Sequence, residues 1–130
     1  MDPKPKKLAV KRTRTGLGLF VLEPIQAGRR IVEYRGKLVS TRESHNLSGM
    51  YLFEVDKHRI IDGSERGNIA RYINHSCEPN SIAYSSGSRV WIWSKEAIKP
   101  GSAITIDYGQ DYFEQYIKPK GCKCEKCKPA

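Results

Sequence analysis

The sequence contains no long hydrophobic run. Its uncharged apolar stretches are as short as Ala103-Ile104-Thr105-Ile106, whereas a membrane-spanning helix needs about 20 consecutive apolar residues. The chain also does not open with the basic, apolar and small-residue segments of a secretion signal. From these absences we expect a soluble, intracellular protein that makes no membrane contact.

Acidic residues are scarce relative to basic ones. The 130 residues include 14 Asp and Glu against 23 Lys and Arg, which gives a net charge of +9. The basic residues gather near the two ends, at residues 4–14 and 118–128. Two interpretations remain open, namely solvated tails that aid solubility and contact with a polyanion such as nucleic acid. Neither basic run is interleaved with aromatic residues, so base stacking is not expected.

Cysteine is also rare, with four residues in the chain. Cys122, Cys124 and Cys127 lie close together, and Cys77 lies well before them. In a reducing compartment, thiols clustered in this way are more typical of a metal site than of a disulfide framework. The sequence therefore favours a metal site, with two disulfides as the alternative.

The apolar content suits one domain with its own core, since 38% of the residues are hydrophobic. Short β-type runs alternate with turn residues, and the expected strands are residues 8–11, 19–22, 30–34, 37–39, 51–55, 59–61, 81–84, 90–93 and 103–106. Hairpin turns are expected at residues 35–36, 56–58 and 85–89, a further turn at 16–18, and short helical turns at 40–43, 68–73 and 113–117. This pattern predicts a mostly β domain built of small sheets.

The most informative segment runs from Gly67 to Asn80 and ends in Asn74-His75-Ser76-Cys77-Glu78-Pro79-Asn80. Alone, it could be a capped turn or the cysteine–histidine pair of a thiol protease. Other motifs occur in a fixed order around it: Gly16-Leu17-Gly18-Leu19-Phe20, Glu33-Tyr34-Arg35-Gly36, Tyr51-Leu52-Phe53, Ile61-Asp62-Gly63, Asp107-Tyr108-Gly109 and Gly121-Cys122-Lys123-Cys124 with Cys127. Together they resemble SET-domain protein lysine methyltransferases with a post-SET zinc-binding tail.

The resemblance implies a domain organisation and a fold. A basic N-terminal arm would cover residues 1–7, the SET domain residues 8–117 and the post-SET tail residues 118–130. The implied fold is mostly β, with several small antiparallel sheets, short helical turns and a threaded C-terminal segment. The implied activity is transfer of a methyl group from S-adenosylmethionine to a protein lysine, with histone-like or other basic proteins as substrates.

The resemblance also implies the residues that bind S-adenosylmethionine. Glycine lets the main chain approach a ligand closely, and backbone groups of the first motif would do this here. Asn74 and His75 would hold the adenine and methionine moieties. The full implied set is Thr15, Gly16, Leu17, Gly18, Tyr51, Asn74, His75 and Tyr108.

Three aromatic residues besides Tyr108 are implied at the lysine channel. Tyr108 would be central to catalysis because its hydroxyl can orient the amine without bringing a full charge. Tyr34, the second implied catalytic residue, would form part of the channel wall. Tyr112 would cover the channel, and Trp93 would limit how many methyl groups the amine accepts. Strand alternation places Trp91 and Trp93 on one face of their strand, so a plain core-covering role for both is the alternative.

Zinc is implied on Cys77, Cys122, Cys124 and Cys127, which uses every cysteine of the chain. Four thiolates form a closed structural site, so no catalytic metal is expected. Three features depart from the family pattern. Only two residues separate Cys124 from Cys127, Gly101-Ser102-Ala103 stands in place of a Gly-Glu-Glu motif, and the insert between residues 39 and 51 is short.

The sequence thus predicts an S-adenosylmethionine-dependent protein lysine methyltransferase, located in the nucleus or on chromosomes in a eukaryotic cell and in the cytoplasm of a bacterium. The rival from another class is a catalytically inactive basic zinc module that binds chromatin or nucleic acid. The presence of Tyr108, Asn74 and His75 together speaks against it. A cysteine hydrolase that uses Cys77 and His75 is disfavoured, because near-adjacent residues seldom form a working pair.

Overall fold

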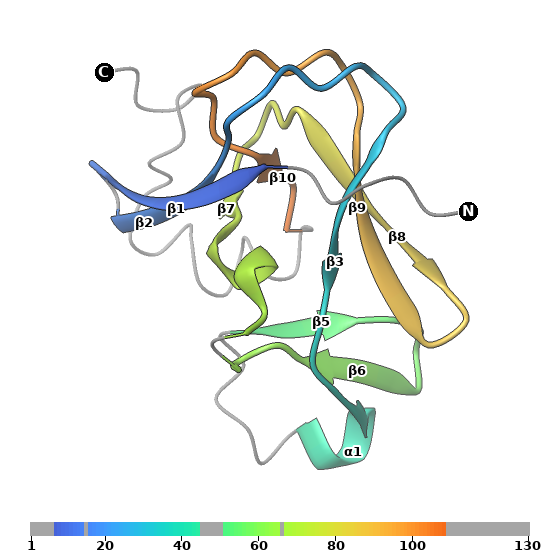
Figure 1. Cartoon of the computed structure of the whole chain (residues 1–130). Coiled ribbons are helices and arrows are strands. Elements are labelled where there is room, and N and C mark those ends of the chain that lie inside the picture. The colour runs from blue at the N-terminus through green and yellow to red at the C-terminus, as the bar shows by residue number, and fades with distance from the viewer. Residues whose placement is uncertain (1–6, 15, 45–50, 66, 109–130) are drawn as a thin grey trace.

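A computed structural model describes residues 7–14, 16–44, 51–65 and 67–108. In this part the chain is built mainly of short strands (Figure 1). Their order is β1 (Leu8–Thr13), β2 (Gly16–Val21), β3 (Arg30–Tyr34), β4 (Lys37–Ser40), α1 (Thr41–Ser44), β5 (Leu52–Glu54), β6 (Arg59–Asp62), the 3₁₀ turn η1 (Ile69–Tyr72), β7 (Asn74–His75), β8 (Ser81–Ser86), β9 (Arg89–Ser94) and β10 (Thr105–Ile106). No helix among these residues has the length and apolar character needed to cross a membrane.

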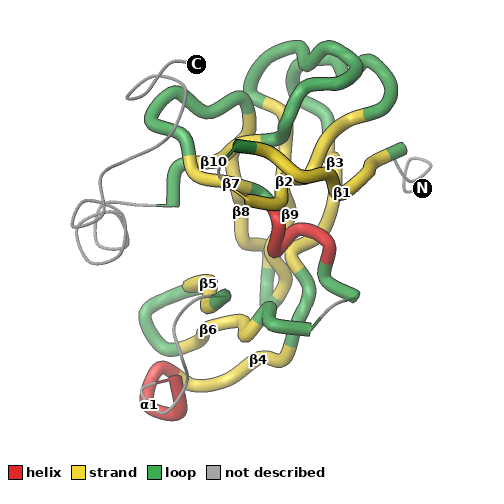
Figure 2. Tube along the Cα trace, turned by 90° about the vertical axis from the view of Figure 1, so that its left-hand side faces the viewer, coloured by secondary structure: helices red, strands yellow, loops and turns green. Residues whose placement is uncertain are grey.

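The strands form four small sheets. Three are antiparallel, with the strand orders β1–β2, β3–β9–β8 and β4–β6–β5. The fourth pairs β7 with β10 in parallel. Figure 2 shows the β4–β6–β5 sheet and α1 at one end of the molecule, with β1, β2, β7 and β10 toward the other. The prediction of a mostly β fold with several small antiparallel sheets is confirmed, and the parallel pair is an addition to it.

The core lies on one face of the β3–β9–β8 sheet and beneath β2. On β9, Val90 and Ile92 are fully buried, whereas Trp91 and Trp93 are half-buried on the opposite face. This confirms the expected alternation along the strand. Leu19 and Val21 of β2 are also fully buried, and each such side chain contributes about 1.5–3 kcal/mol of transfer free energy.

Two turn predictions are wrong. Gly16-Leu17-Gly18 lies within β2, and the β1–β2 hairpin closes earlier in the chain, at the pair Thr13–Gly16. Residues 35–36 do not close a hairpin either, because β3 pairs with β9 whereas β4 pairs with β6. At Gly36 the chain passes so close to the carbonyl group of Asp62 that a side chain would collide with it. Glycine is therefore needed there for close approach rather than for a turn.

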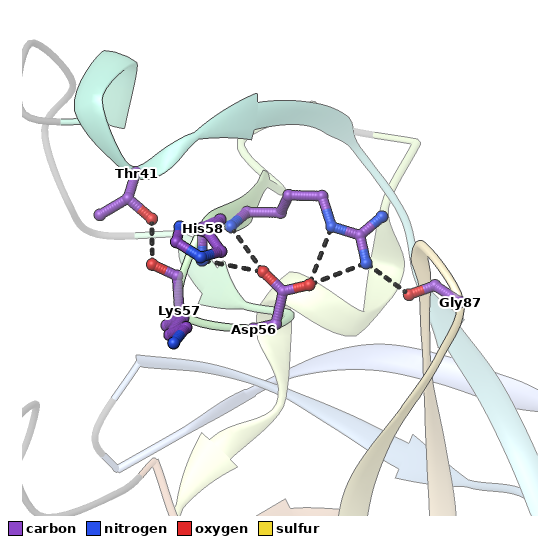
Figure 3. Close-up of polar contacts among 6 residues, drawn as sticks. Thr41, Asp56, Lys57, His58 and Gly87 are labelled. Atoms are coloured by element: carbon purple, nitrogen blue, oxygen red, sulfur yellow. Dashed lines mark hydrogen bonds and ion pairs between the residues drawn. The ribbon is translucent and has the colours of Figure 1, made fainter.

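Other local predictions are confirmed. The hairpins β5–β6 and β8–β9 form as expected. Asp56 shapes the turn of the first hairpin, since its carboxylate accepts the main-chain N–H of His58 at 2.9 Å (Figure 3). Thr41 Oγ1 also bonds to this turn, because it donates to Lys57 O at 2.9 Å. Ser40 Oγ accepts the N–H of Glu43 at 3.1 Å and so caps α1. The expected helical turn at 113–117, the threaded C-terminal segment and residues 1–6 of the expected arm at 1–7 lie outside the described residues.

Candidate active site

The parallel pairing of β7 with β10 brings two distant motifs together. Asn74 faces Thr105 and His75 faces Ile106 across this pair. Tyr108 follows β10, and its main-chain N–H donates to Nδ1 of His75 at 3.1 Å. The two rings lie 5.3 Å apart between centroids, and the Tyr108 hydroxyl donates to the carbonyl oxygen of Ile73. The Asn-His and Asp-Tyr motifs therefore form one site, which we call the β7–β10 junction.

The glycine motif of β2 borders this junction. Asn74 Nδ2 donates to the carbonyl oxygen of Leu17 at 3.0 Å. A Cβ on Gly18 would lie only 3.0 Å from Thr13 Cγ2 and 3.2 Å from Asn74 Nδ2, so a larger residue would push β2 away from Asn74. Gly16 has a φ of +117°, and a Cβ added there would meet nothing within 4 Å in the described part of the chain. The main chain is therefore exposed at Gly16, whereas Gly18, which borders Asn74, is buried.

His75 is nearly buried, with 7% of its side chain exposed. Burial lowers its pKa because it disfavours the charged ring, and Asp107, 3.8 Å away, opposes this only in part. The neutral ring accepts the Tyr108 N–H on Nδ1 and therefore carries its proton on Nε2. Nε2 lies 3.6 Å from Cys77 Sγ, so it faces the sulfur as a donor. This tautomer cannot take a proton from the thiol, which argues against a cysteine hydrolase.

Asn80 has a structural role at the junction that was not predicted from the sequence. Its Nδ2 donates to Ala103 O at 2.8 Å, and its Oδ1 accepts the N–H of Thr105 at 3.0 Å. Its own N–H donates to Thr105 Oγ1 at 3.1 Å. These three bonds hold the segment that leads into β10 and Tyr108. The available signal was its position at the end of the Asn-His-Ser-Cys-x-Pro-Asn motif.

Tyr34 and Tyr51 are brought together by a hydrogen bond. Tyr34 is 6% exposed, and its hydroxyl donates to the main-chain oxygen of Tyr51 at 2.8 Å. Its ring lies 5.0 Å from that of Phe53. Gly63 packs so closely on the Tyr34 ring that a side chain there would collide with it. Tyr34 thus links β3 to the chain that enters β5, and its place in a lysine channel stays a prediction.

Trp93 and Tyr34 are not brought together by their shared sheet. Trp93 pairs with Arg30 and Ile82, whereas Tyr34 pairs with Val90. Val90 and Trp93 point to opposite faces of β9. The side chains of Tyr34 and Trp93 therefore leave the β3–β9–β8 sheet on opposite faces. A role for Trp93 in limiting methylation stays a prediction.

The remaining predicted site residues, namely Thr15, Tyr112, Cys122, Cys124 and Cys127, lie outside the described residues. Cys77 is half-buried beside His75. Within the described ranges no three His, Cys, Asp or Glu side chains group as metal ligands. The structure thus describes one of the four predicted zinc ligands.

Comparison with known proteins identifies the family. The sequence model of the protein family described as "SET domain" matches residues 16–109 of this chain. The chain is 37% identical over 119 residues to "Histone-lysine N-methyltransferase set-2" of Caenorhabditis elegans, covering 81% of this chain and 8% of that protein. It is 36% identical over 124 residues to "Histone-lysine N-methyltransferase SETD1B" of Homo sapiens, covering 85% of this chain and 6% of that protein. With "Histone-lysine N-methyltransferase ASHH1" of Arabidopsis thaliana the identity is 33% over 121 residues, and the match covers 83% of this chain and 25% of that protein.

The match and the geometry concern the same residues. The matched region begins at Gly16, runs through Asn74 and His75, and ends just after Tyr108. The strand β1 lies before it and pairs with β2. The chain spans less than a tenth of the length of the first relatives it matches, so the likeness concerns one domain of those longer proteins. This chain belongs to the SET domain family.

Proposed function

We propose that this chain is a protein lysine N-methyltransferase that uses S-adenosylmethionine as methyl donor. The observation that carries the proposal is the β7–β10 junction. There Asn74 Nδ2 donates to the main chain of the glycine motif at Leu17, and the Tyr108 N–H donates to the ring of the neighbouring His75. A methyl donor held by the glycine motif and Asn74 would lie within reach of Tyr108.

The chemistry needs alignment more than it needs a charged catalytic group. S-adenosylmethionine supplies an electrophilic methyl group on a positive sulfur, which a neutral lysine amine displaces in line. A free lysine has a pKa near 10.4, so keeping it neutral near pH 7.4 costs about 4 kcal/mol unless its surroundings lower that value. Aromatic walls such as Tyr34, which exclude water, would act in that direction.

Tyr108 is held in a way that suits this task. Its hydroxyl proton is given to the carbonyl oxygen of Ile73, and the phenolic oxygen also carries lone pairs that can act as acceptors. They can orient the N–H groups of the amine and interact with the polarised methyl group. The bond from its main-chain N–H to His75 fixes the base of the side chain.

The proposed substrates are histone-like or other basic proteins. Curated relatives are named histone-lysine N-methyltransferases, and this chain covers a small part of each. In a eukaryotic cell we place the protein in the nucleus or on chromosomes, and in a bacterium in the cytoplasm. The basic runs at residues 4–14 and 118–128 are proposed to contact nucleic acid without sequence preference.

A structural zinc ion on Cys77, Cys122, Cys124 and Cys127 belongs to the same proposal. Nε2 of His75 faces Cys77 Sγ as a donor, which suits a thiolate. Such a site would fold a post-SET tail, residues 118–130, against a SET domain of residues 8–117 and so place Tyr112 over the channel. Residues 1–7 would remain a basic arm.

A radiolabel transfer assay tests the proposed function. The purified chain is incubated with methyl-labelled S-adenosylmethionine and either core histones or whole-cell protein, and the labelled residues are identified by mass spectrometry. The proposal predicts label on lysine ε-amines. The rival, an inactive basic zinc module, predicts no label together with binding of the chain to nucleosomes or nucleic acid.

A further inference from the structure

Arg71 lies on η1 just ahead of the Asn-His motif, and its guanidinium group meets two aromatic rings. Its Cζ lies 4.5 Å from the ring centroid of Tyr51 and 5.0 Å from that of Tyr72. Its Nη1 donates to the main-chain oxygen of Ser64. These contacts connect η1 with residues that flank the small β4–β6–β5 sheet.

The guanidinium is held without a carboxylate partner among the described residues. Its Nε is buried and has no hydrogen-bond acceptor in the part of the chain that the structure describes. A buried donor without a partner is unfavourable, so the position of Arg71 depends on ring stacking and on Ser64. Guanidinium stacks well on aromatic faces because it is planar and weakly hydrated.

Tyr51 depends on Arg71 in turn. The main-chain oxygen of Tyr51 is held twice, by the Tyr34 hydroxyl and by the N–H of Gly63, each at 2.8 Å. These bonds fix the backbone but leave rotation about χ1 open. The Tyr51 ring itself lies under the Arg71 guanidinium, with 4.5 Å between Cζ and the ring centroid.

We propose that Arg71 is a positioning residue that sets the orientation of the Tyr51 ring toward the bound methyl donor. The inference rests on the proposed function, in which Tyr51 contacts S-adenosylmethionine. Arg71 acts through Tyr51 and does not itself touch the reacting atoms. It also couples η1, which leads directly into Asn74, to the chain that enters β5.

The planar shape of the group is the property that matters. Lysine retains the positive charge but has no planar group that can contact two rings while donating to Ser64. Arg71→Lys should therefore behave like Arg71→Met, whereas a role based on charge alone would be rescued by lysine. Arg89→Met is the matched control, because Arg89 also stacks on an aromatic ring, at 4.9 Å from Trp91, on the outer side of the β3–β9–β8 sheet.

The kinetic test is a double-mutant cycle with Tyr51. Arg71→Met and Arg71→Lys should each lower kcat/KM about tenfold, as expected for a stacking contact of this kind, and Arg89→Met less than twofold. The same loss should persist in the Tyr51→Phe background, which keeps the ring. In the Tyr51→Leu background, Arg71→Met should add less than a twofold further loss.

A spectroscopic test separates failure of this inference from failure of the proposed function. With isotope-labelled tyrosine, Arg71→Met should shift the Tyr51 ring resonances, and Arg89→Met should leave them in place, whether or not the chain transfers methyl groups. Full activity of Arg71→Lys, an equal loss from Arg71→Met with and without the Tyr51 ring, or unmoved Tyr51 resonances would each overturn the inference. An inactive parent with shifted resonances would count against the proposed function alone.

Discussion

The β3–β9–β8 sheet has an outer face, opposite the core, that carries Trp91 and Trp93. This face and the β7–β10 junction both bring polar and aromatic side chains into contact, but they do so differently. At the junction, His75 and Asn80 bond to the main chain of segments far away in the sequence, and those contacts are largely enclosed. On the outer face, Arg89 pairs with Glu33 through two bonds of 2.9 Å and stacks on Trp91. The Arg89 side chain remains 59% exposed.

From this difference we predict in which region the loss of a contact has the larger effect on activity or stability. A surface ion pair contributes about 0–1 kcal/mol, because water and salt screen it and long side chains lose entropy. A hydrogen bond inside the protein is different, since removing one partner leaves a buried group without water or protein to replace it. Substitutions at the junction should therefore impair activity or stability strongly, and those on the outer face should do so weakly.

The largest expected effect comes from Tyr108→Phe at the junction. The variant loses the hydroxyl that bonds to Ile73 O and that would orient the amine, so kcat should fall by about 100-fold or more. Binding of S-adenosylmethionine, measured by calorimetry, and the far-UV circular dichroism spectrum should stay close to those of the parent. Turnover comparable to that of the parent would remove Tyr108 from the catalytic centre.

Removal of zinc should have the next largest effect. We expect about one zinc ion per chain, as four thiolates around one tetrahedral ion require. Chelation or Cys124→Ser should loosen the tail and reduce activity, because metal binding orders its ligands. Elemental analysis of the reduced protein provides the check, and an active, metal-free protein contradicts the zinc assignment.

Asn80→Ala tests the enclosed polar contacts without touching the catalytic tyrosine. The substitution leaves Ala103 O and the N–H of Thr105 without their side-chain partner. The free energy of unfolding should fall by about 2–3 kcal/mol, as measured by urea denaturation. Ser86→Ala, at an exposed position of β8, should change it by less than about 0.5 kcal/mol. Equal effects of the two substitutions would contradict the distinction between the regions.

Trp93→Phe tests whether the outer face extends to the lysine channel. If Trp93 crowds the amine, the smaller ring should raise the proportion of trimethyl-lysine. Mass spectrometry at limiting enzyme measures the product distribution, and Trp91→Phe serves as the control because Trp91 lies on the same face. An unchanged distribution, or a parent that already trimethylates, would show that Trp93 does not limit methylation.

The smallest effect is expected for Glu33→Gln. The hydrogen bonds from Arg89 lower the pKa of Glu33, burial partly opposes this, and the charges of Arg89, Arg35 and Arg30 add to the lowering. A carboxyl group whose folded pKa is depressed stabilises the fold above its unfolded pKa, near 4.3, and loses that contribution as the pH falls through the folded value. Glu33→Gln should therefore cost at most about 1 kcal/mol at pH 7.

Urea denaturation at several pH values measures this contribution. The difference in stability between parent and Glu33→Gln should shrink steadily below about pH 4. High salt should reduce it as well, because the Arg89 partner is 59% exposed and the pair therefore borders on solvent. A difference that stays constant across this pH range would mean that the Glu33 carboxylate does not stabilise the fold through its charge.

The sequence predicted much of the local structure and the family. The bounds of β3, the hairpins β5–β6 and β8–β9, and the placement of Trp91 and Trp93 on one face of β9 all follow from strand alternation and turn chemistry. Pairing partners did not follow, because alternation fixes which face of a strand is buried but not which strand lies beside it. For this reason the turn at residues 35–36 was wrong, and the parallel pairing of β7 with β10 was not foreseen.

Side-chain roles that depend on tertiary approach were equally out of reach. Asn80 stood at the end of the central motif, but its partners, Ala103 and Thr105, lie far along the chain. Arg71 stood within the same segment, yet its contact with Tyr51 exists only because η1 packs beside the entry to β5. The motif indicated which part of the sequence contains the site, but the contacts of its side chains depend on the tertiary structure.

The most direct test of the β7–β10 junction as the methyl-transfer site is a crystal structure of the chain with S-adenosylhomocysteine. We predict that the ligand contacts the main chain of residues 16–18 and the Asn74 amide, with its sulfur directed toward Tyr108 and the Tyr51 ring still stacked on Arg71. A ligand bound away from the junction, or a Tyr108 hydroxyl turned away from the sulfur, would contradict the assignment.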